Sequence, residues 1–216
     1  MPKIKFPPLE YASEEGIVAI GGSLTIENLL EAYQNGIFPW PVEEAPLLWF
    51  SPNPRAILDF KDLHIPKRLQ QELRHKNFQF KIDQRFDEVL FYCAEGKNRK
   101  QNGTWITEEI QIAYQAFHRA GFAHSFECYQ EDQLVGGLYG VSLGSMFAGE
   151  SMFYLEPGAS KAALLFAIQS LQKRGATWMD IQVMSPLLKS FGAHEISRKV
   201  FLTKLKKALH EKPIFP

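Results

Sequence analysis

Three strands expected between residues 124 and 155 constrain the fold more than any other feature of the chain. The segments 124–130, 134–141 and 145–155 are rich in β-branched and aromatic residues, and short turns separate them. Such short connections join antiparallel strands, because a parallel pair needs a crossover of a dozen residues or more. The sequence therefore predicts an antiparallel meander. Glycines at 136, 137 and 140 predict a bulge within it, or a close approach by a ligand.

Helical periodicity surrounds the meander on both sides. Helices are expected over 65–76 and 84–95, after Thr107, from a cap at Ser160 to Gly175, and over 199–211. Further strands are expected over 77–82 and 177–183. This order predicts an α+β protein whose mixed, mostly antiparallel sheet is flanked by helices.

The first 62 residues predict a small N-terminal α+β domain, with the larger domain over 63–216. A strand is expected over 17–20, a helix from its cap at Thr25 to Gly36, and a strand over 56–60. Between them, residues 37–55 combine several prolines with several aromatic residues, a composition that disfavours regular structure. This aromatic stretch either packs between the domains or forms one wall of a binding cleft.

Composition excludes several classes of protein. The 216 residues carry 24 Lys and Arg against 24 Asp and Glu, so the surface is not uniformly basic. The two cysteines, Cys93 and Cys128, lack metal or redox spacing and are expected to be reduced core residues of a cytoplasmic protein. No signal peptide, membrane span, P-loop or metal-ligand cluster is evident, so neither a membrane nor a metal is expected as a partner.

Polar residues interrupt two apolar strands. Glu150 lies in the last strand of the meander, and Asp180 and Gln182 lie two residues apart in the strand 177–183. Strict alternation would place Asp180 and Gln182 on one face with Trp178, and would leave the opposite face as plain core. A carboxylate is costly to bury without a partner. The acids are therefore either structural, or they open onto one shared cavity with a polar floor.

The helix expected over 65–76 is strongly basic. Leu69 and Leu73 mark its buried side, and its basic residues are Lys67, Arg68, Arg74, His75 and Lys76. Such a face is either simply solvated or it contacts phosphates. Lys97, Arg99 and Lys100 form a second basic loop.

Taken together, these residues resemble one bacterial family, the leucyl/phenylalanyl-tRNA–protein transferases. The similarity runs from about residue 6 to residue 205, and the order and spacing of its segments make chance agreement improbable. The matching segments are Gly36–Trp40, Trp49–Arg55, Gly103–Ile106, His124–Ser125, Leu134–Gly140, Gly149–Phe153, Ala159–Lys161, Asp180–Gln182 and Gly192–Ile196. Ile181 replaces a cysteine that is usual in the family, and alternation predicts that it points away from the site.

The resemblance implies a catalytic domain like that of the N-acetyltransferase superfamily. It also implies an enzyme that moves Leu or Phe, and Met less well, from Leu-tRNA, Phe-tRNA or Met-tRNA. The acceptor is the α-amine of a protein that begins with Arg or Lys, and the product is marked for degradation. The donor is an activated ester, so no cofactor and no metal are needed.

The resemblance also implies roles for individual residues. Asp180 and Gln182 would be the catalytic pair, and Glu150 would meet the donor's α-ammonium. A neutral amide is a poor base, so we expect the Gln182 carbonyl to orient the acceptor amine while Asp180 holds that amide. The basic helix would contact the tRNA acceptor stem. The remaining substrate-binding residues would be Leu138, Phe147, Met152, Phe153, Trp40, Trp105 and Tyr33.

Two other functions fit parts of the sequence. An acyl-coenzyme A transferase of the same fold would need a glycine-rich loop before the helix at 160, where the chain has one glycine, Gly158. A non-catalytic RNA-binding module would not need Asp180 and Gln182 together.

Overall fold

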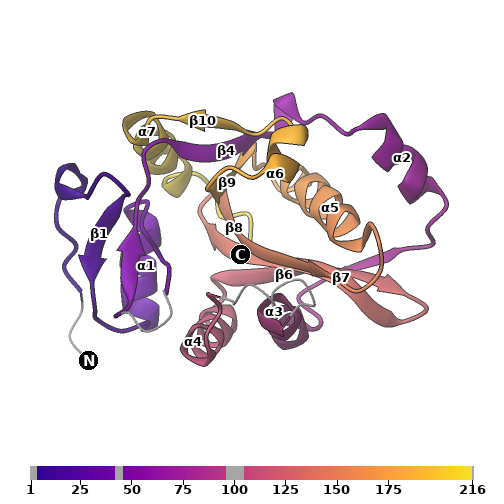
Figure 1. Cartoon of the computed structure of the whole chain (residues 1–216), viewed down its shortest axis with the longest axis horizontal. Coiled ribbons are helices and arrows are strands. Elements are labelled where there is room, and N and C mark those ends of the chain that lie inside the picture. Colours follow the sequence, from indigo (N-terminus) through magenta and orange to yellow (C-terminus); the bar gives the residue numbers. More distant parts are fainter. Residues whose placement is uncertain (1–3, 42–45, 96–104, 216) are drawn as a thin grey trace.

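A seven-stranded sheet forms the centre of the larger part of the molecule (Figure 1). The computed structural model describes residues 4–41, 46–95 and 105–215. The strand order is β10-β4-β9-β8-β7-β6-β5. The strands are β4 (Arg55–Asp59), β5 (Gln79–Ile82), β6 (Ala123–Gln130), β7 (Gln133–Leu143), β8 (Met146–Tyr154), β9 (Trp178–Gln182) and β10 (His194–Ile196). The predicted meander is β6, β7 and β8, in antiparallel register.

The sheet is mixed, as predicted. Within the described residues, β8 and β9 run parallel and the other neighbouring strands run antiparallel. The helix α5 (Ala159–Lys173) makes the crossover that a parallel pair requires. Its N-cap is Gly158, with a φ of 86°, and not Ser160 as expected. Glycine adopts this left-handed conformation without the Cβ clash of other residues, which explains the earlier start.

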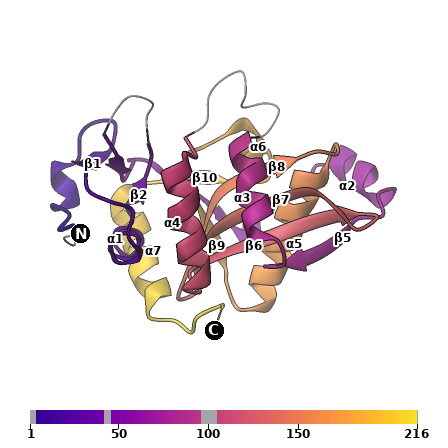
Figure 2. The ribbon, with the colours of Figure 1, turned by 90° about the horizontal axis from the view of Figure 1, so that it is seen from below.

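Helices cover both faces of the sheet (Figures 1 and 2). On one face, α3 (Phe86–Glu95) and α4 (Glu108–Arg119) cover a core that continues into the N-terminal part. On the other face, α5 and the short α6 (Pro186–Ser190) cover a second core. The helix α2 (Lys67–Arg74) follows the 3₁₀ turn Phe60–Asp62, and α7 (Arg198–Leu209) packs beside the N-terminal part. None of the described helices is long and apolar enough to cross a membrane.

The N-terminal part has its own small sheet. Its strands β1 (Ile17–Ile20), β3 (Leu48–Phe50) and β2 (Phe38–Pro39) lie in that order, beside α1 (Ile26–Gln34) and a 3₁₀ turn, Leu9–Tyr11. Thr25 caps α1 as predicted, because its hydroxyl accepts from the backbone N–H of Asn28. The expectation of no regular structure over 37–55 was wrong: Pro39 lies in a strand of only two residues at the edge of its sheet, where a proline is tolerated.

The strand β4 joins the two parts of the chain. It lies between β10 and β9 in the large sheet, although it precedes the predicted domain boundary after residue 62. That boundary stays a prediction, and β4 would then be a strand that the first domain contributes to the second.

Two bulges interrupt the meander beside the predicted glycines, one next to Gly136 and one opposite the step from Tyr139 to Gly140. Gly136 pairs with Cys128 and Leu134 with Tyr129, which leaves Val135 without an opposite residue. In β8, Ser151 pairs with Tyr139 and Gly149 with Gly140, which leaves Glu150 as the extra residue. An extra residue in one strand reverses the faces to which later side chains point.

Gly140 tests how tightly β7 and β8 pack. A Cβ at this position would lie 2.2 Å from the backbone oxygen of Ala148 and 2.5 Å from the Phe147 ring. We expect Gly140→Ala to lower the free energy of unfolding by about 1–3 kcal/mol, because overpacking against backbone forces it to shift. The matched control is Gly149→Ala, whose Cβ would meet only the flexible end of Met179 at 3.0 Å. Urea denaturation measures both variants, and equal losses would contradict the packing argument.

Candidate active site

A cavity lies where β8 and β9 separate. These strands pair only at Phe147 with Met179 and at Ala148 with Asp180. Beyond these pairs, a cavity of about 290 Å³ opens between the strands. Its lining comes from β8, β9, α5, α6 and the N-terminal part, and consists of Phe38, Pro39, Trp40, Trp105, Leu138, Tyr139, Gly149, Glu150, Ser151, Met152, Leu164, Met179, Ile181, Gln182, Val183, Ser185 and Leu188.

The face of β9 that was predicted to be plain core forms part of the cavity wall. Met179, Ile181 and Val183 line it, so the prediction that Ile181 points away from the site was wrong. Gln182 reaches the same cavity because its φ of 57° ends the alternation of the strand. Left-handed backbone is unfavourable for a residue with a Cβ, so other contacts must hold Gln182 in place.

The predicted apolar residues of the meander fall into two groups. Leu138 and Met152 line the cavity. Phe147 is fully buried beside Phe126, and Phe153 is 5% exposed and stacks on Tyr92 of α3. The bulge explains the second placement: the extra residue in β8 lets Phe147 and Met152 share one face and puts Phe153 on the other.

Aromatic side chains from the N-terminal part, together with Trp105 before α4, close one side of the cavity. The Trp40 and Trp105 ring centroids lie 6.3 Å apart, and those of Phe38 and Trp40 lie 6.0 Å apart. Trp40 is 37% exposed, so its ring is accessible from solvent. Of the two roles considered for this aromatic stretch, a cavity wall is therefore the one that Phe38 and Trp40 fill.

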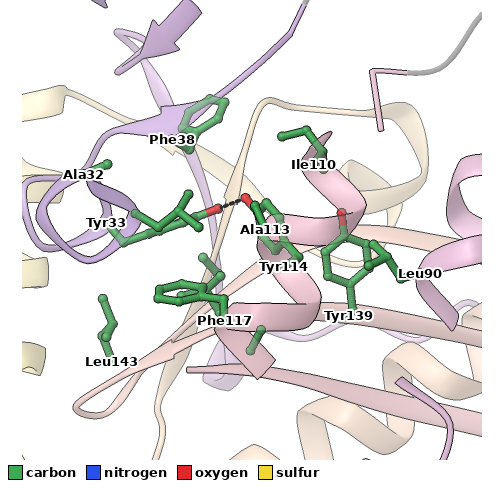
Figure 3. Packing of buried hydrophobic residues seen from close by; sticks show 14 of the residues in the cluster. Ala32, Tyr33, Phe38, Leu90, Ile110, Ala113, Tyr114, Phe117, Tyr139 and Leu143 are labelled. Atoms are coloured by element: carbon green, nitrogen blue, oxygen red, sulfur yellow. Dashed lines mark hydrogen bonds between the residues drawn. The ribbon is translucent and has the colours of Figure 1, made fainter. Parts of the chain in front are cut away.

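Glu150 and Gln182 meet at the polar end of the cavity. The Gln182 side-chain nitrogen Nε2 donates to Glu150 Oε1 at 2.8 Å, and the Tyr114 hydroxyl donates to Glu150 Oε2 at 3.4 Å. The Tyr33 and Tyr114 hydroxyls are hydrogen-bonded at 2.5 Å (Figure 3). Tyr33, predicted to bind substrate, does not line the cavity and reaches it through Tyr114.

Burial is the main cause that raises the pKa of Glu150 to about 7. The negative charge of Asp180 also raises this pKa, whereas the hydrogen bonds from Tyr33 and Gln182 and the charge of Arg55 lower it. Burial and the Glu150 charge together raise the pKa of both Tyr33 and Tyr114 well above its ordinary value. The two tyrosines therefore stay protonated and can donate, while Glu150 changes charge near neutral pH.

Asp180 lies beneath the cavity and does not line it. It is 1% exposed, and Arg55, also 1% exposed, donates to it through Nε at 2.9 Å and through Nη2 at 2.6 Å. Asp180 Oδ1 also accepts from the backbone N–H of Gln182 at 3.0 Å. Two expectations are therefore wrong: Asp180 does not share the cavity with Glu150, and it holds the backbone of Gln182 and not its amide.

Arg55 is the residue that the sequence reasoning missed. It belongs to the matching segment Trp49–Arg55, and it begins a strand whose other residues are mostly buried. A cation at the start of an apolar strand needs a buried acid as its partner. That signal was present in the sequence, but nothing in the sequence placed β4 beside β9.

The basic residues predicted to contact tRNA gather on α2 and its C-terminal end. Lys67, Arg68, Arg74 and His75 are exposed, Lys76 is half-buried, and Leu69 is buried as predicted. The helix packs near the start of α5, where a Cβ on Gly158 would lie 3.0 Å from Glu72. The second basic loop, 97–100, and the first residues of the segment Gly103–Ile106 lie outside the described residues.

The segment His124–Ser125 lies away from the cavity and has a structural explanation. Asp83 accepts from the Ser125 backbone N–H and is hydrogen-bonded to the His124 ring, both at 2.7 Å. Ser125 also donates to Glu127, which accepts from the backbone N–H groups of Gln84 and Arg85 at the start of α3. These bonds join the loop before α3 to β6.

Diverging strands, an apolar cavity and one carboxylate beside one amide define a class of protein: an enzyme that binds a small apolar group near an ionisable acid. Comparison with known sequences places the chain within this class. Residues 57–206 match the family leucyl/phenylalanyl-tRNA protein transferase, and residues 22–53 match the N-terminal domain of the same family. The chain belongs to this family, and it is an aminoacyl-tRNA–protein transferase.

Relatives support the assignment over most of the chain. The protein is 47% identical over 206 residues to a leucyl/phenylalanyl-tRNA–protein transferase of Anaeromyxobacter dehalogenans, covering 95% of this chain and 88% of the relative. It is 49% identical over 198 residues to one of Methylococcus capsulatus, covering 91% and 84%. Among solved structures, the GCN5-related glucosamine N-acetyltransferase region of a fungal multi-domain GH3 β-N-acetylglucosaminidase shares 12% identity at a TM-score of 0.46, covering 67% of this chain and 20% of that one.

The raised pKa of Glu150 predicts a pH-dependent stability difference. The folded pKa of about 7 exceeds the ordinary value of 4.5, so the folded state holds a proton that the unfolded state releases between these values. We expect Glu150 to lose stability relative to Glu150→Gln as the pH rises from 4.5 to 7. Urea denaturation of both proteins across this range measures the difference. A wild-type stability that stays constant relative to Glu150→Gln, or that increases relative to it with rising pH, would show that the carboxyl is not shifted upward.

Proposed function

We propose that the enzyme transfers Leu or Phe, and Met less well, from aminoacyl-tRNA to the α-amine of proteins that begin with Arg or Lys. The product would be marked for degradation, and the reaction would take place in the cytoplasm, where aminoacyl-tRNA is made. The observation that carries this proposal is the apolar cavity with Glu150 and Gln182 at its polar end.

The donor's side chain occupies the apolar part of the cavity. Leu138, Met152 and Ile181 are lining residues that suit an apolar side chain without a β-branch, whether aliphatic or aromatic, and the flexible Met152 adapts to both. Once ionised, Glu150 pairs with the donor's α-ammonium, for which its carboxylate has free lone pairs beside those used by Gln182 and Tyr114. The donor is thus bound by its side chain and its amine together.

Gln182 orients the acceptor amine. Because its Nε2 donates to Glu150, its carbonyl Oε1 is the acceptor left over, and it has no hydrogen-bond partner among the described residues. The amine nitrogen attacks the ester carbon, the new N–C bond forms, and the bond from that carbon to the ribose oxygen breaks. The proton lost by nitrogen goes to the ribose oxygen. Asp180 does not take it, because both its oxygens already accept hydrogen bonds from Arg55.

The tRNA lies along the aromatic wall and the basic helix. Trp40 and Trp105 offer faces on which the terminal adenosine stacks. The basic residues of α2 contact backbone phosphates, which positions the acceptor stem without reading its sequence. This division lets one enzyme accept several tRNAs.

The deciding experiment mixes the protein with Phe-charged tRNA and a peptide that begins with Arg. We expect the peptide to gain one Phe, and a peptide that begins with Lys to do the same. Peptides with an acetylated N-terminus or an initial Glu should stay unchanged. Ile-tRNA should react about 10–200-fold less well, because shape alone rejects the β-branch.

Other outcomes of this assay identify the competing functions. A peptide modified from acetyl-coenzyme A, but not from Phe-tRNA, would indicate an acyl-coenzyme A transferase. Tight binding of charged tRNA without a lengthened peptide would indicate an RNA-binding module.

The α2 patch predicts a salt-dependent loss of tRNA binding. Each phosphate contact contributes about one unit to the slope of log K against log salt concentration. We expect Lys67→Ala/Arg68→Ala to reduce that slope by about two. The matched control is Lys206→Ala/Lys207→Ala, which removes two exposed charges from α7. Filter binding of Phe-tRNA at several salt concentrations measures both, and equal slopes for the two double variants would remove α2 from the interface.

A further inference from the structure

Arg55 is the most completely enclosed charged side chain beneath the cavity. Its Nε and Nη2 atoms donate one hydrogen bond to each oxygen of Asp180, which makes a bidentate pair. Its Nη1 donates to the carbonyl of Gly36 at 3.2 Å. The guanidinium also lies over the Phe38 ring at 4.7 Å and over the Phe201 ring at 4.5 Å. A planar cation held on its edges and its faces has one available orientation.

The contacts of Arg55 come from separate parts of the chain. Gly36 and Phe38 follow α1 in the N-terminal part, Phe201 lies in α7, and Asp180 lies in β9. Arg55 therefore fixes the end of β9 relative to the N-terminal wall of the cavity. Of these contacts, only the one with Asp180 connects Arg55 to the residues at the polar end of the cavity.

Asp180 passes this constraint to Gln182. The same Oδ1 that accepts from Arg55 accepts from the Gln182 backbone N–H. That bond holds Gln182 at a φ of 57°, a conformation that costs roughly 1–2 kcal/mol for a residue with a Cβ. From this backbone the amide reaches Glu150, which fixes the direction of its carbonyl. Loss of Arg55 would leave Asp180 without its partner, and Gln182 would no longer be held in its left-handed backbone conformation.

We propose that Arg55 is a positioning residue for aminoacyl transfer: through Asp180 it holds Gln182 in the backbone conformation that aims its carbonyl into the cavity. This inference rests on the proposed function, because the transfer assay reports it. The same proposal makes Asp180, the acid of the ion pair with Arg55, a positioning residue as well.

The charges of the pair also act on Glu150 in opposite directions. The groups that face Glu150 are Tyr33 from α1, Tyr114 from α4, Gln182 and Asp180 from β9, and Arg55 from β4. Asp180 raises the pKa of Glu150 and Arg55 lowers it. Removing one partner should therefore move the titration of Glu150 in a direction that depends on which partner is removed. A residue that merely stabilised the fold would not produce opposite shifts.

The test compares Arg55→Met, Arg55→Lys and Asp180→Asn with the wild type. We expect Arg55→Met to lower kcat by about 100-fold while KM for Phe-tRNA changes less than about threefold, because the loss affects orientation in the transition state and not donor binding. Arg55→Lys keeps the charge without the planar fork, so it should recover only part of kcat.

The pH dependence supplies the second readout. We expect the Glu150 titration to move up in Arg55→Met, down in Asp180→Asn, and little in Arg55→Lys. NMR of ¹³C-labelled glutamate side chains follows this titration without any substrate, and Glu150→Gln identifies the signal. If the wild type fails to lengthen the peptide, the proposed function fails, while the opposite shifts still report the coupling within the pair.

The matched control is Arg198→Met. Arg198 joins α7 to the N-terminal part through a hydrogen bond from Nη1 to the Leu9 carbonyl at 2.7 Å, and within the part of the chain that the structure describes it makes no hydrogen bond to β9. It should lower stability and leave kcat and the Glu150 titration unchanged. If Arg55→Met folds poorly, Arg55→Lys and Asp180→Asn carry the test. Unchanged kcat in these variants, a loss confined to KM, or Glu150 shifts in the same direction would overturn the proposal.

Discussion

The separation of β8 from β9 is the constraint on which the rest of the site depends. Two parallel strands that remained paired along their length would close the space between them with backbone hydrogen bonds. Here the ladder stops after Ala148 and Asp180, and the side chains beyond it line a cavity. The bulge at Glu150 lies at this point, so the extra residue places the carboxylate beside the opening.

Two acids near this opening have different roles because their surroundings differ. Asp180 is sealed against Arg55 and stays paired, whereas Glu150 faces the cavity and titrates near neutral pH. Gln182 connects them, with its backbone on Asp180 and its amide on Glu150. One neutral side chain thus connects the buried ion pair to the carboxylate at the polar end of the cavity.

The sequence predicted the elements of the fold well, because their periodicity is local. The meander, the helices on both faces and the cap at Thr25 all follow from spacing and turn residues. Pairings between distant segments did not follow. The partner of Asp180 lies 125 residues away in sequence, and no local pattern indicates that Arg55 is its neighbour.

The candidate site was predicted residue by residue with mixed success. Glu150, Gln182, Leu138, Met152, Trp40 and Trp105 meet at the cavity. Phe153 was assigned to the pocket by the family resemblance, but the bulge places it on the other face. Ile181 was assigned away from the site because Asp180 and Gln182 were expected to share the cavity face, whereas Ile181 lines the cavity and the left-handed Gln182 reaches it from the same strand. Such departures are decided by tertiary contacts, as the hydrogen bond from Gln182 to Asp180 illustrates.

The extra residue in β8 has a consequence for how such a cavity diversifies. Deleting the unpaired residue, or moving it beyond the cavity, would exchange the inward and outward sets of side chains that follow Glu150. A phenylalanine would then enter the chamber in place of a methionine. The shape of the cavity in this architecture therefore depends partly on strand registration, and an insertion or deletion can alter it as deeply as a substitution.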